Sequence, residues 1–174
     1  AAPVVPLPVM PLLETDDDNP ASKTRVALTD TGDALSAWLA GTPGGDVSSF
    51  GGSLSNASYS FVGEAAEDES GRSVASAGDV DNDGLDDLLI GAPLNDAGGG
   101  SAGKSYLMLG SVVTAAAAGT TFDLSNASYS FVGEAASDAS GFSVASAGDV
   151  DNDGRADLLI GARLNAAGGA NAGK

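Results

Sequence analysis

The chain of 174 residues contains neither cysteine nor histidine, and its 7 Lys and Arg residues face 24 Asp and Glu residues, a net charge of −17. The first two absences exclude disulfide bonds and zinc sites built from Cys and His. They also exclude catalysis within this chain by a cysteine nucleophile or by a triad containing histidine. The shortage of positive charge argues against nucleic acid and anionic lipid as partners, because both carry negative phosphate groups.

Aromatic residues and long apolar runs are also scarce, whereas glycine is abundant at 25 of 174 residues. Glycine at this frequency indicates many turns and favours an all-β fold. The hydrophobic fraction of 43% excludes a wholly disordered polyanion. Residues 1–13 are apolar, but four prolines interrupt them, so they predict neither a signal peptide nor a membrane-spanning helix. We therefore expect no membrane insertion.

A long repeat occupies the second part of the chain. Residues 55–64 return unchanged at residues 125–134, an offset of 70 residues. Over the wider stretch from 54 to 104, 42 of 51 positions are identical in the copy. Such a repeat predicts stacked copies of one supersecondary unit. We expect units at about 54–123 and 124–174, with the second ending before its last strand.

The first part of the chain differs in composition from the repeat. Prolines and the acidic stretch 14–19 favour a linker over residues 1–50, and residues 51–174 are predicted to be the repeat region. Within the linker, residues 31–41 predict a short helix. Leu35, Trp38 and Leu39 would form its apolar face.

Four segments of the repeat have strand character. They are residues 58–62 with their copy 128–132, 73–78, 87–92 and 104–109. The first alternates aromatic residues with serine, the second consists of small residues, and the others are rich in aliphatic residues. Four short strands per repeat are typical of a propeller blade. The strand of small residues suits the innermost position, because blades converge at the axis.

An acidic loop follows the small-residue strand in each copy. The pattern D-x-D-x-D-G-x-x-D begins at Asp79 and again at Asp149. Alternate carboxylates of such a loop turn inward, Gly permits the sharp bend, and the carbonyl at the seventh position points back. These oxygen ligands suit Ca²⁺ better than a transition metal. The predicted ligands are Asp79, Asp81, Asp83, Leu85 and Asp87 in the first loop, and Asp149, Asp151, Asp153, Arg155 and Asp157 in the second.

We predict one Ca²⁺ ion in each loop and two in total. The alternative is a surface turn without metal, but the same five-point pattern occurs twice at one spacing, which favours the ion. An EF-hand needs Glu at the twelfth position of the loop and helices on both sides. Here Ile90 and Ile160 occupy that position, and the flanking segments have strand character. Asp86 lies outside the inward-facing set, and its copy is Ala156, so we do not count it as a ligand.

The combination of these elements resembles the FG-GAP repeat of integrin α-subunit propellers, and more closely that of bacterial extracellular relatives. The resemblance covers about residues 54–174 and is carried by residues 70–75 and 140–145, the acidic loops, and residues 88–93 and 161–163. Ser70 and Ser140 depart from the family where it usually has Phe, as does Arg163 where it has Pro. The resemblance implies an all-β partial propeller of four-stranded blades, with calcium loops between the first and second strands. Family propellers have seven blades, so we expect an incomplete ring.

No residues of the chain suggest catalysis. Glu64, Glu67 and Glu69 are close in sequence, but the copy replaces the last two by Ser137 and Ala139, so no acid–base pair recurs. We predict a calcium-binding propeller segment of a secreted or cell-surface protein, a scaffold for adhesion to a protein or glycan ligand. The alternatives are an accessory region of a secreted enzyme and a structural spacer. Exposed strand edges of an incomplete ring would favour self-association.

Overall fold

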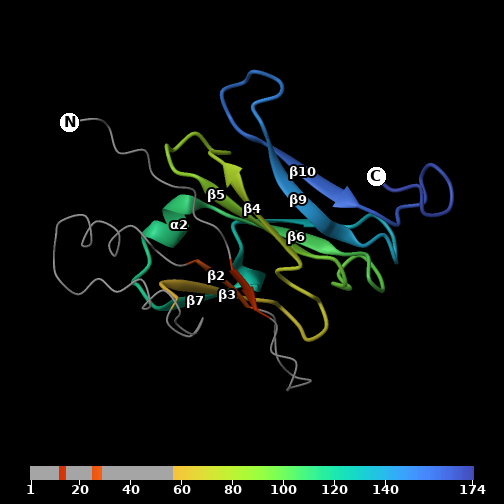
Figure 1. Cartoon of the computed structure of the whole chain (residues 1–174), viewed down its shortest axis with the longest axis horizontal. Helices are drawn as coiled ribbons and strands as arrows, with labels where there is room; N and C mark the ends of the chain where they lie inside the picture. Colours follow the sequence, from red (N-terminus) through yellow and green to blue (C-terminus); the bar gives the residue numbers. More distant parts are fainter. Residues whose placement is uncertain (1–11, 15–24, 29–56) are drawn as a thin grey trace.

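The computed structural model describes residues 12–14, 25–28 and 57–174 (Figure 1). This part of the chain is all-β apart from a short helix, α2 (Gly110–Thr114), and a 3₁₀ turn, η3 (Leu124–Asn126). The helix predicted over residues 31–41 lies outside the described residues. Within them, no helix is both long enough and apolar enough to cross a membrane.

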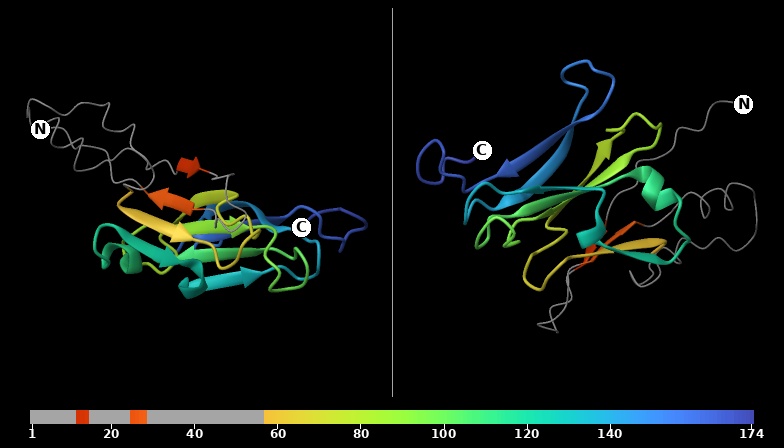
Figure 2. Two further views of the ribbon diagram at one scale, coloured as in Figure 1. Left: turned by 90° about the horizontal axis from the view of Figure 1, so that it is seen from below. Right: turned by 180° about the vertical axis from the view of Figure 1, so that it is seen from behind.

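The described strands form three sheets (Figures 1 and 2). The N-terminal sheet contains, in spatial order, β1 (Leu12–Glu14), β2 (Arg25–Leu28), β3 (Tyr59–Val62) and β7 (Thr120–Asp123). The central sheet contains β4 (Ser73–Gly78), β5 (Asp87–Ala92), β6 (Lys104–Met108) and β8 (Tyr129–Val132). The C-terminal hairpin consists of β9 (Ser140–Gly148) and β10 (Asp157–Ala162). All pairs are antiparallel except β3 with β7.

The strand predictions hold closely for the repeat. The observed β4 and β5 coincide with the predicted segments, and β3, β6 and β8 differ from them by one residue at one end. Two further strands, β1 and β2, lie within the residues predicted to be a linker. The sequence pattern does not predict β7 or α2, which follow β6 within the first unit.

The central sheet does not coincide with one sequence repeat. Its outer strand, β8, comes from the second copy and pairs with β6, with Leu107 opposite Tyr129. The equivalent strand of the first copy, β3, pairs instead with β2 and β7 in the N-terminal sheet. Because each copy of this segment joins the sheet that precedes it along the chain, the sheets are offset from the repeats by one strand. Consecutive repeats are therefore joined by backbone hydrogen bonds.

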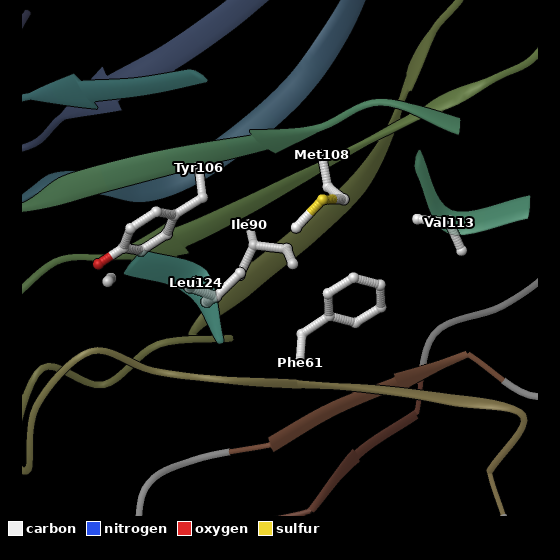
Figure 3. Close-up of a cluster of buried hydrophobic side chains, with 7 residues drawn as sticks. Phe61, Ile90, Tyr106, Met108, Val113 and Leu124 are labelled. Carbon is white, nitrogen blue, oxygen red and sulfur yellow. The ribbon is translucent and has the colours of Figure 1, made fainter. Parts of the chain in front are cut away.

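The main hydrophobic core lies between the N-terminal sheet and the central sheet (Figure 3). Its buried members are Phe61, Ile90, Ala92, Tyr106, Met108, Val113 and Leu124. Phe61 from β3 is fully buried, and its ring stacks on Phe122 with 5.2 Å between the ring centroids. The copy of Phe61 is Phe131, which is 39% exposed on β8. Phe61 therefore packs between the two sheets in the first copy, whereas no aromatic stacking is seen for its copy among the described residues.

The opposite face of the central sheet packs against β9. Leu89 and Leu107 contact Ala77 and Val144 there. The neighbouring residues Ile90 and Tyr106 point into the main core, as the period of two in a strand requires. Burial on both faces explains why the apolar run of β5 is continuous. Small residues on β4 allow β9 to lie directly beside it (Figure 1).

A polar network fastens the loop between β3 and β4 to the central sheet. Lys104 Nζ lies 2.7 Å from Glu64 Oε1, and Asn95 Nδ2 donates to Asp68 Oδ2 at 2.7 Å. Burial raises the pKa of the adjacent Tyr106 hydroxyl, and the charges of Glu64 and Asp68 raise it further. All four residues of the network recur in the second copy, where Asn165 bonds to Asp138 and Lys174 pairs with Glu134. The network therefore belongs to the repeat, and no catalytic pair is needed to explain its carboxylates.

The two ion pairs of this network are expected to differ in their contribution to stability. The side chains of Lys104 and Glu64 are 12% and 24% exposed, whereas those of Lys174 and Glu134 are 58% and 61% exposed. Lys104→Met leaves the poorly solvated carboxylate of Glu64 without its partner. It should lower the free energy of unfolding by about 2 kcal/mol, less than the 3–5 kcal/mol known for fully buried pairs. Lys174→Met should cost less than about 0.5 kcal/mol, because exposed pairs contribute little. Urea unfolding followed by circular dichroism measures both, and equal losses would contradict the difference in burial.

Candidate metal centre

Each acidic loop joins the two strands of a hairpin. The first connects β4 to β5, and the second connects β9 to β10. This is the position that the sequence predicts, between the first and second strands. In both hairpins the strand register shifts next to the loop, between Ser76 and Gly78 in the first and between Asp157 and Leu158 in the second. The loops therefore begin where the regular ladder ends.

Side-chain bonds to the backbone shape the first loop around Asp79. Its two carboxylate oxygens accept the N–H groups of Asp83 at 3.0 Å and Gly84 at 2.9 Å. Asp81 Oδ1 also accepts from Asp83, at 3.2 Å. Gly84 has a φ of 87°, in the region where a side chain is strained, as the predicted sharp bend requires. The second loop repeats these bonds around Asp149.

The loops gather carboxylates into two clusters that could hold a metal ion. In the first, one oxygen from each of Asp79, Asp81 and Asp87 lies within 4.8 Å of the others. In the second, the members are Asp149, Asp151 and Asp153. Three of the four predicted carboxylates thus meet in each loop, but Asp83 and Asp157 stand outside their clusters. Oxygen ligands at this spacing fit a hard divalent cation such as Ca²⁺.

Leu85 and Arg155 are the two predicted ligands that would act through the main chain. Their N–H groups donate to Asp83 Oδ1 and Asp153 Oδ1, each at 2.9 Å. Coordination by their carbonyl oxygens stays a prediction. Asp86, which the sequence pattern places outside the ligand set, accepts a hydrogen bond from Ser76 Oγ at 3.4 Å and takes no part in the cluster.

Asp87 is the least exposed carboxylate of the first loop and is fully buried. Its oxygens accept the N–H of Val80 at 2.9 Å and the N–H of Gly110 at 2.8 Å. Burial raises the pKa of this carboxyl, the two backbone bonds lower it, and the charges of Asp81 and Asp83 raise it again. A divalent cation would offset this burial and repulsion, so the residues present fit such an ion.

The contact of Asp87 with Gly110 was not foreseen from the sequence. Gly110 begins α2, which lies beyond β6, so the two residues meet only because β5 and β6 pair. The other bond of Asp87, from the N–H of Val80, recurs in the second copy, where Asp157 Oδ2 accepts the N–H of Val150 at 2.7 Å. That bond is thus part of the repeat, whereas the bond to Gly110 fixes the first cluster to the following helix.

Comparison with known proteins identifies the repeat. The model of the FG-GAP repeat matches at residues 70–108 and again at residues 140–174. The chain carries two FG-GAP repeats. Each match includes one acidic loop with the strands on both sides of it. FG-GAP repeats imply a β-propeller, in agreement with the all-β fold. They also point to a non-enzymatic repeat domain.

A curated relative shares this similarity. The chain is 35% identical over 140 residues to Integrin alpha-5 of Xenopus laevis, a match that covers 75% of this chain and 12% of the relative. The chain therefore spans only about an eighth of that protein's length. The predicted resemblance to FG-GAP repeats of the integrin α type is confirmed.

Proposed function

We propose that this chain is a calcium-binding segment of a β-propeller and acts as a recognition or adhesion scaffold in an extracellular or cell-surface protein. The observation that carries the proposal is the pair of acidic clusters at equivalent positions of two FG-GAP repeats. Similarity to Integrin alpha-5 supports the extracellular setting. The repeat region is taken as residues 51–174, and its two repeats would form part of a larger ring.

Calcium would act by linking neighbouring repeats. The two acidic loops are in direct contact, because the N–H of Ala156 donates to the carbonyl oxygen of Asp79 at 2.9 Å. Asp79 is also a predicted ligand, so an ion in the first loop would fix the strand end on which the second loop rests. We expect the ions to be held by Asp79, Asp81, Asp83, Leu85 and Asp87, and by Asp149, Asp151, Asp153, Arg155 and Asp157. An ordered inner edge would present the rest of the blade in a fixed position to a protein or glycan ligand.

Calcium is expected to raise the thermal stability of the chain, and EDTA should reverse the effect. Extracellular calcium modules bind with dissociation constants of about 10⁻⁴ to 10⁻³ M. Calcium at tenfold the dissociation constant would stabilise the fold by about 1.4 kcal/mol for each site. Calorimetric titration should find two sites. The double variant with Asp81→Ala and Asp151→Ala should lose both the binding heat and the stabilisation.

Asp86→Ala is the matched control for this experiment. It removes a carboxylate from the same loop, but Ala156 already occupies the equivalent position in the second copy. Calcium affinity should stay within about twofold of the unmodified chain, since only general electrostatic attraction is reduced. A melting temperature that responds neither to calcium nor to EDTA would refute the metal sites. A loss in Asp86→Ala as large as in the double variant would show non-specific attraction to acidic surface.

A further inference from the structure

The two repeats differ mainly at the end of the sheet that lies away from the acidic loops. Positions that the fold requires should be the same in both copies, so positions that differ are free to serve another purpose. Of the nine differing positions, seven lie in residues 67–72 before β4 with their copies 137–142, which include the start of β9, or in the segments after β5 and β10. The pairs are Glu67/Ser137, Glu69/Ala139, Arg72/Phe142, Pro93/Arg163, Asp96/Ala166, Gly100/Ala170 and Ser101/Asn171.

Three of these variable residues meet at one point, which we call the Arg–Phe patch: Arg72, Phe142 and Arg163. The guanidinium carbon of Arg163 lies 4.3 Å from the centroid of the Phe142 ring, and that of Arg72 lies 4.9 Å from it. The inner strands bring them together, since Ser73 Oγ on β4 donates to the carbonyl oxygen of Gly141 on β9 at 2.9 Å. The patch thus spans two repeats, and neither repeat could form it alone.

The two arginines of the patch are accessible and weakly engaged. Both are exposed, and within the described residues Arg163 forms no ion pair. In the part of the chain that the structure describes, Arg72 pairs only with Glu69, at 3.9 Å, and both side chains are about half exposed, so this pair contributes little. In contrast, Lys104 and Lys174 each have a carboxylate partner at close range.

The surroundings of the patch have lost negative charge in the second copy. The first copy has three carboxylates and one guanidinium group at the variable positions of this end, whereas the second has one guanidinium group and no carboxylate. Among the described residues, the patch therefore sets two guanidinium groups against one carboxylate within ion-pair range, that of Glu69, in a chain whose net charge is −17. Such a site attracts an anionic group at short range, although the whole chain repels long polyanions.

We propose that the Arg–Phe patch binds a carboxylate of a partner protein, on an Asp or Glu side chain or at a C-terminus. Guanidinium groups bind carboxylates through paired N–H bonds. The Phe142 ring holds both groups by cation–π contact and so reduces the ordering needed on binding. The net charge of the chain favours a single carboxylate over a polyanionic glycan. This deepens the proposed recognition role and rests on it, but it does not depend on the metal sites.

Titration of the full chain with a short acidic peptide tests the proposal. The probe is the capped tripeptide Gly-Asp-Gly, and its control is the capped tripeptide Gly-Asn-Gly, which has the same shape without the charge. In calcium-containing buffer, the arginine side-chain N–H signals of Arg72 and Arg163 should shift saturably in ¹⁵N NMR spectra with the Asp peptide. The Asn peptide should leave them unchanged.

Variants that exchange residues between the copies sharpen the test, because each new residue already occurs at the equivalent place. Arg163→Pro and Arg72→Phe should each weaken binding of the Asp peptide about tenfold, as expected when one charge-assisted contact is lost. Glu69→Ala should strengthen it about twofold to threefold, because it removes the carboxylate that competes for Arg72. Ala118→Glu, in the loop between α2 and β7, changes the net charge as much as Arg163→Pro and should have little effect.

Each remaining outcome overturns the proposal. Equal binding of the Asn peptide would exclude recognition of the charge, and an equal loss in Ala118→Glu would show that only net charge matters. The absence of a saturable shift would mean that the patch merely packs the two repeats together. The backbone signals of Gly84 and Gly154 report calcium in the same samples. Calcium-dependent shifts without peptide binding would therefore refute the patch alone, and the reverse result would refute the metal sites alone.

Discussion

Phe61→Ala is expected to destabilise the protein by about 3–5 kcal/mol, the usual cost of removing a buried aromatic side chain. Phe61 is fully buried between the N-terminal and central sheets, and its ring stacks on Phe122 with 5.2 Å between the centroids. The substitution would leave a cavity beside Ile90 and Met108. Because a domain has a free energy of unfolding of only about 5–15 kcal/mol, the loss should be visible as a large shift in the urea midpoint.

Phe131→Ala is the matched control, since residues 125–134 have the same sequence as residues 55–64. Phe131 is 39% exposed, and Tyr129 on the same strand is 57% exposed. The control should therefore cost only about 1–2 kcal/mol, because more than a third of Phe131 stays in water and no close-packed cavity is left. Comparable losses in the two variants would show that β8 is covered as fully as β3 in solution, for example by a second copy of the chain.

Local sequence pattern accounts for most of the strands. The small residues of β4 and the continuous apolar run of β5 determine these strands, because both patterns reflect burial that the structure shows on both sides of the sheet. The loop between them was predicted from the spacing of Asp79, Asp81 and Asp87, and the structure brings these three carboxylates together. Strands and loops that depend on residues close together in the chain can thus be predicted directly from the sequence.

Pairing between distant segments could not be read in the same way. Two identical segments form β3 and β8, yet one pairs with β2 and β7 and the other with β6. Local propensity is equal for both, so the neighbouring sheet decides their partners. The two acidic loops show the same limit, since Asp83 stays outside its cluster while its copy Asp153 joins the second. The Arg–Phe patch likewise depends on the adjacency of β4 and β9.

Gly103→Ala is expected to cost about 2–5 kcal/mol, because it combines backbone strain with a steric clash. Gly103 has a φ of 83°, where an alanine is less stable by about 1–2 kcal/mol. A Cβ atom there would lie 2.2 Å from the carbonyl oxygen and 2.4 Å from the nitrogen of Ser140. Overpacking of this kind typically adds about 1–3 kcal/mol. Urea unfolding and the spread of amide NMR signals would measure the loss.

Gly173→Ala separates the two causes, because Gly173 is the copy of Gly103 and has a similar φ of 79°. Its Cβ atom would come no closer than 3.5 Å to any neighbour among the described residues. The control should therefore show the strain alone, about 1–2 kcal/mol. The carbonyl oxygen of Gly103 also accepts the N–H of Gly133 at 2.8 Å, so a clash at Gly103 would separate the loop after β5 from the segment that leads into β9.

If Gly103→Ala destabilised the protein no more than Gly173→Ala, the close contact between the repeats at Gly103 and Ser140 would be refuted. The Arg–Phe patch, which needs β9 beside β4, would then lose its structural basis.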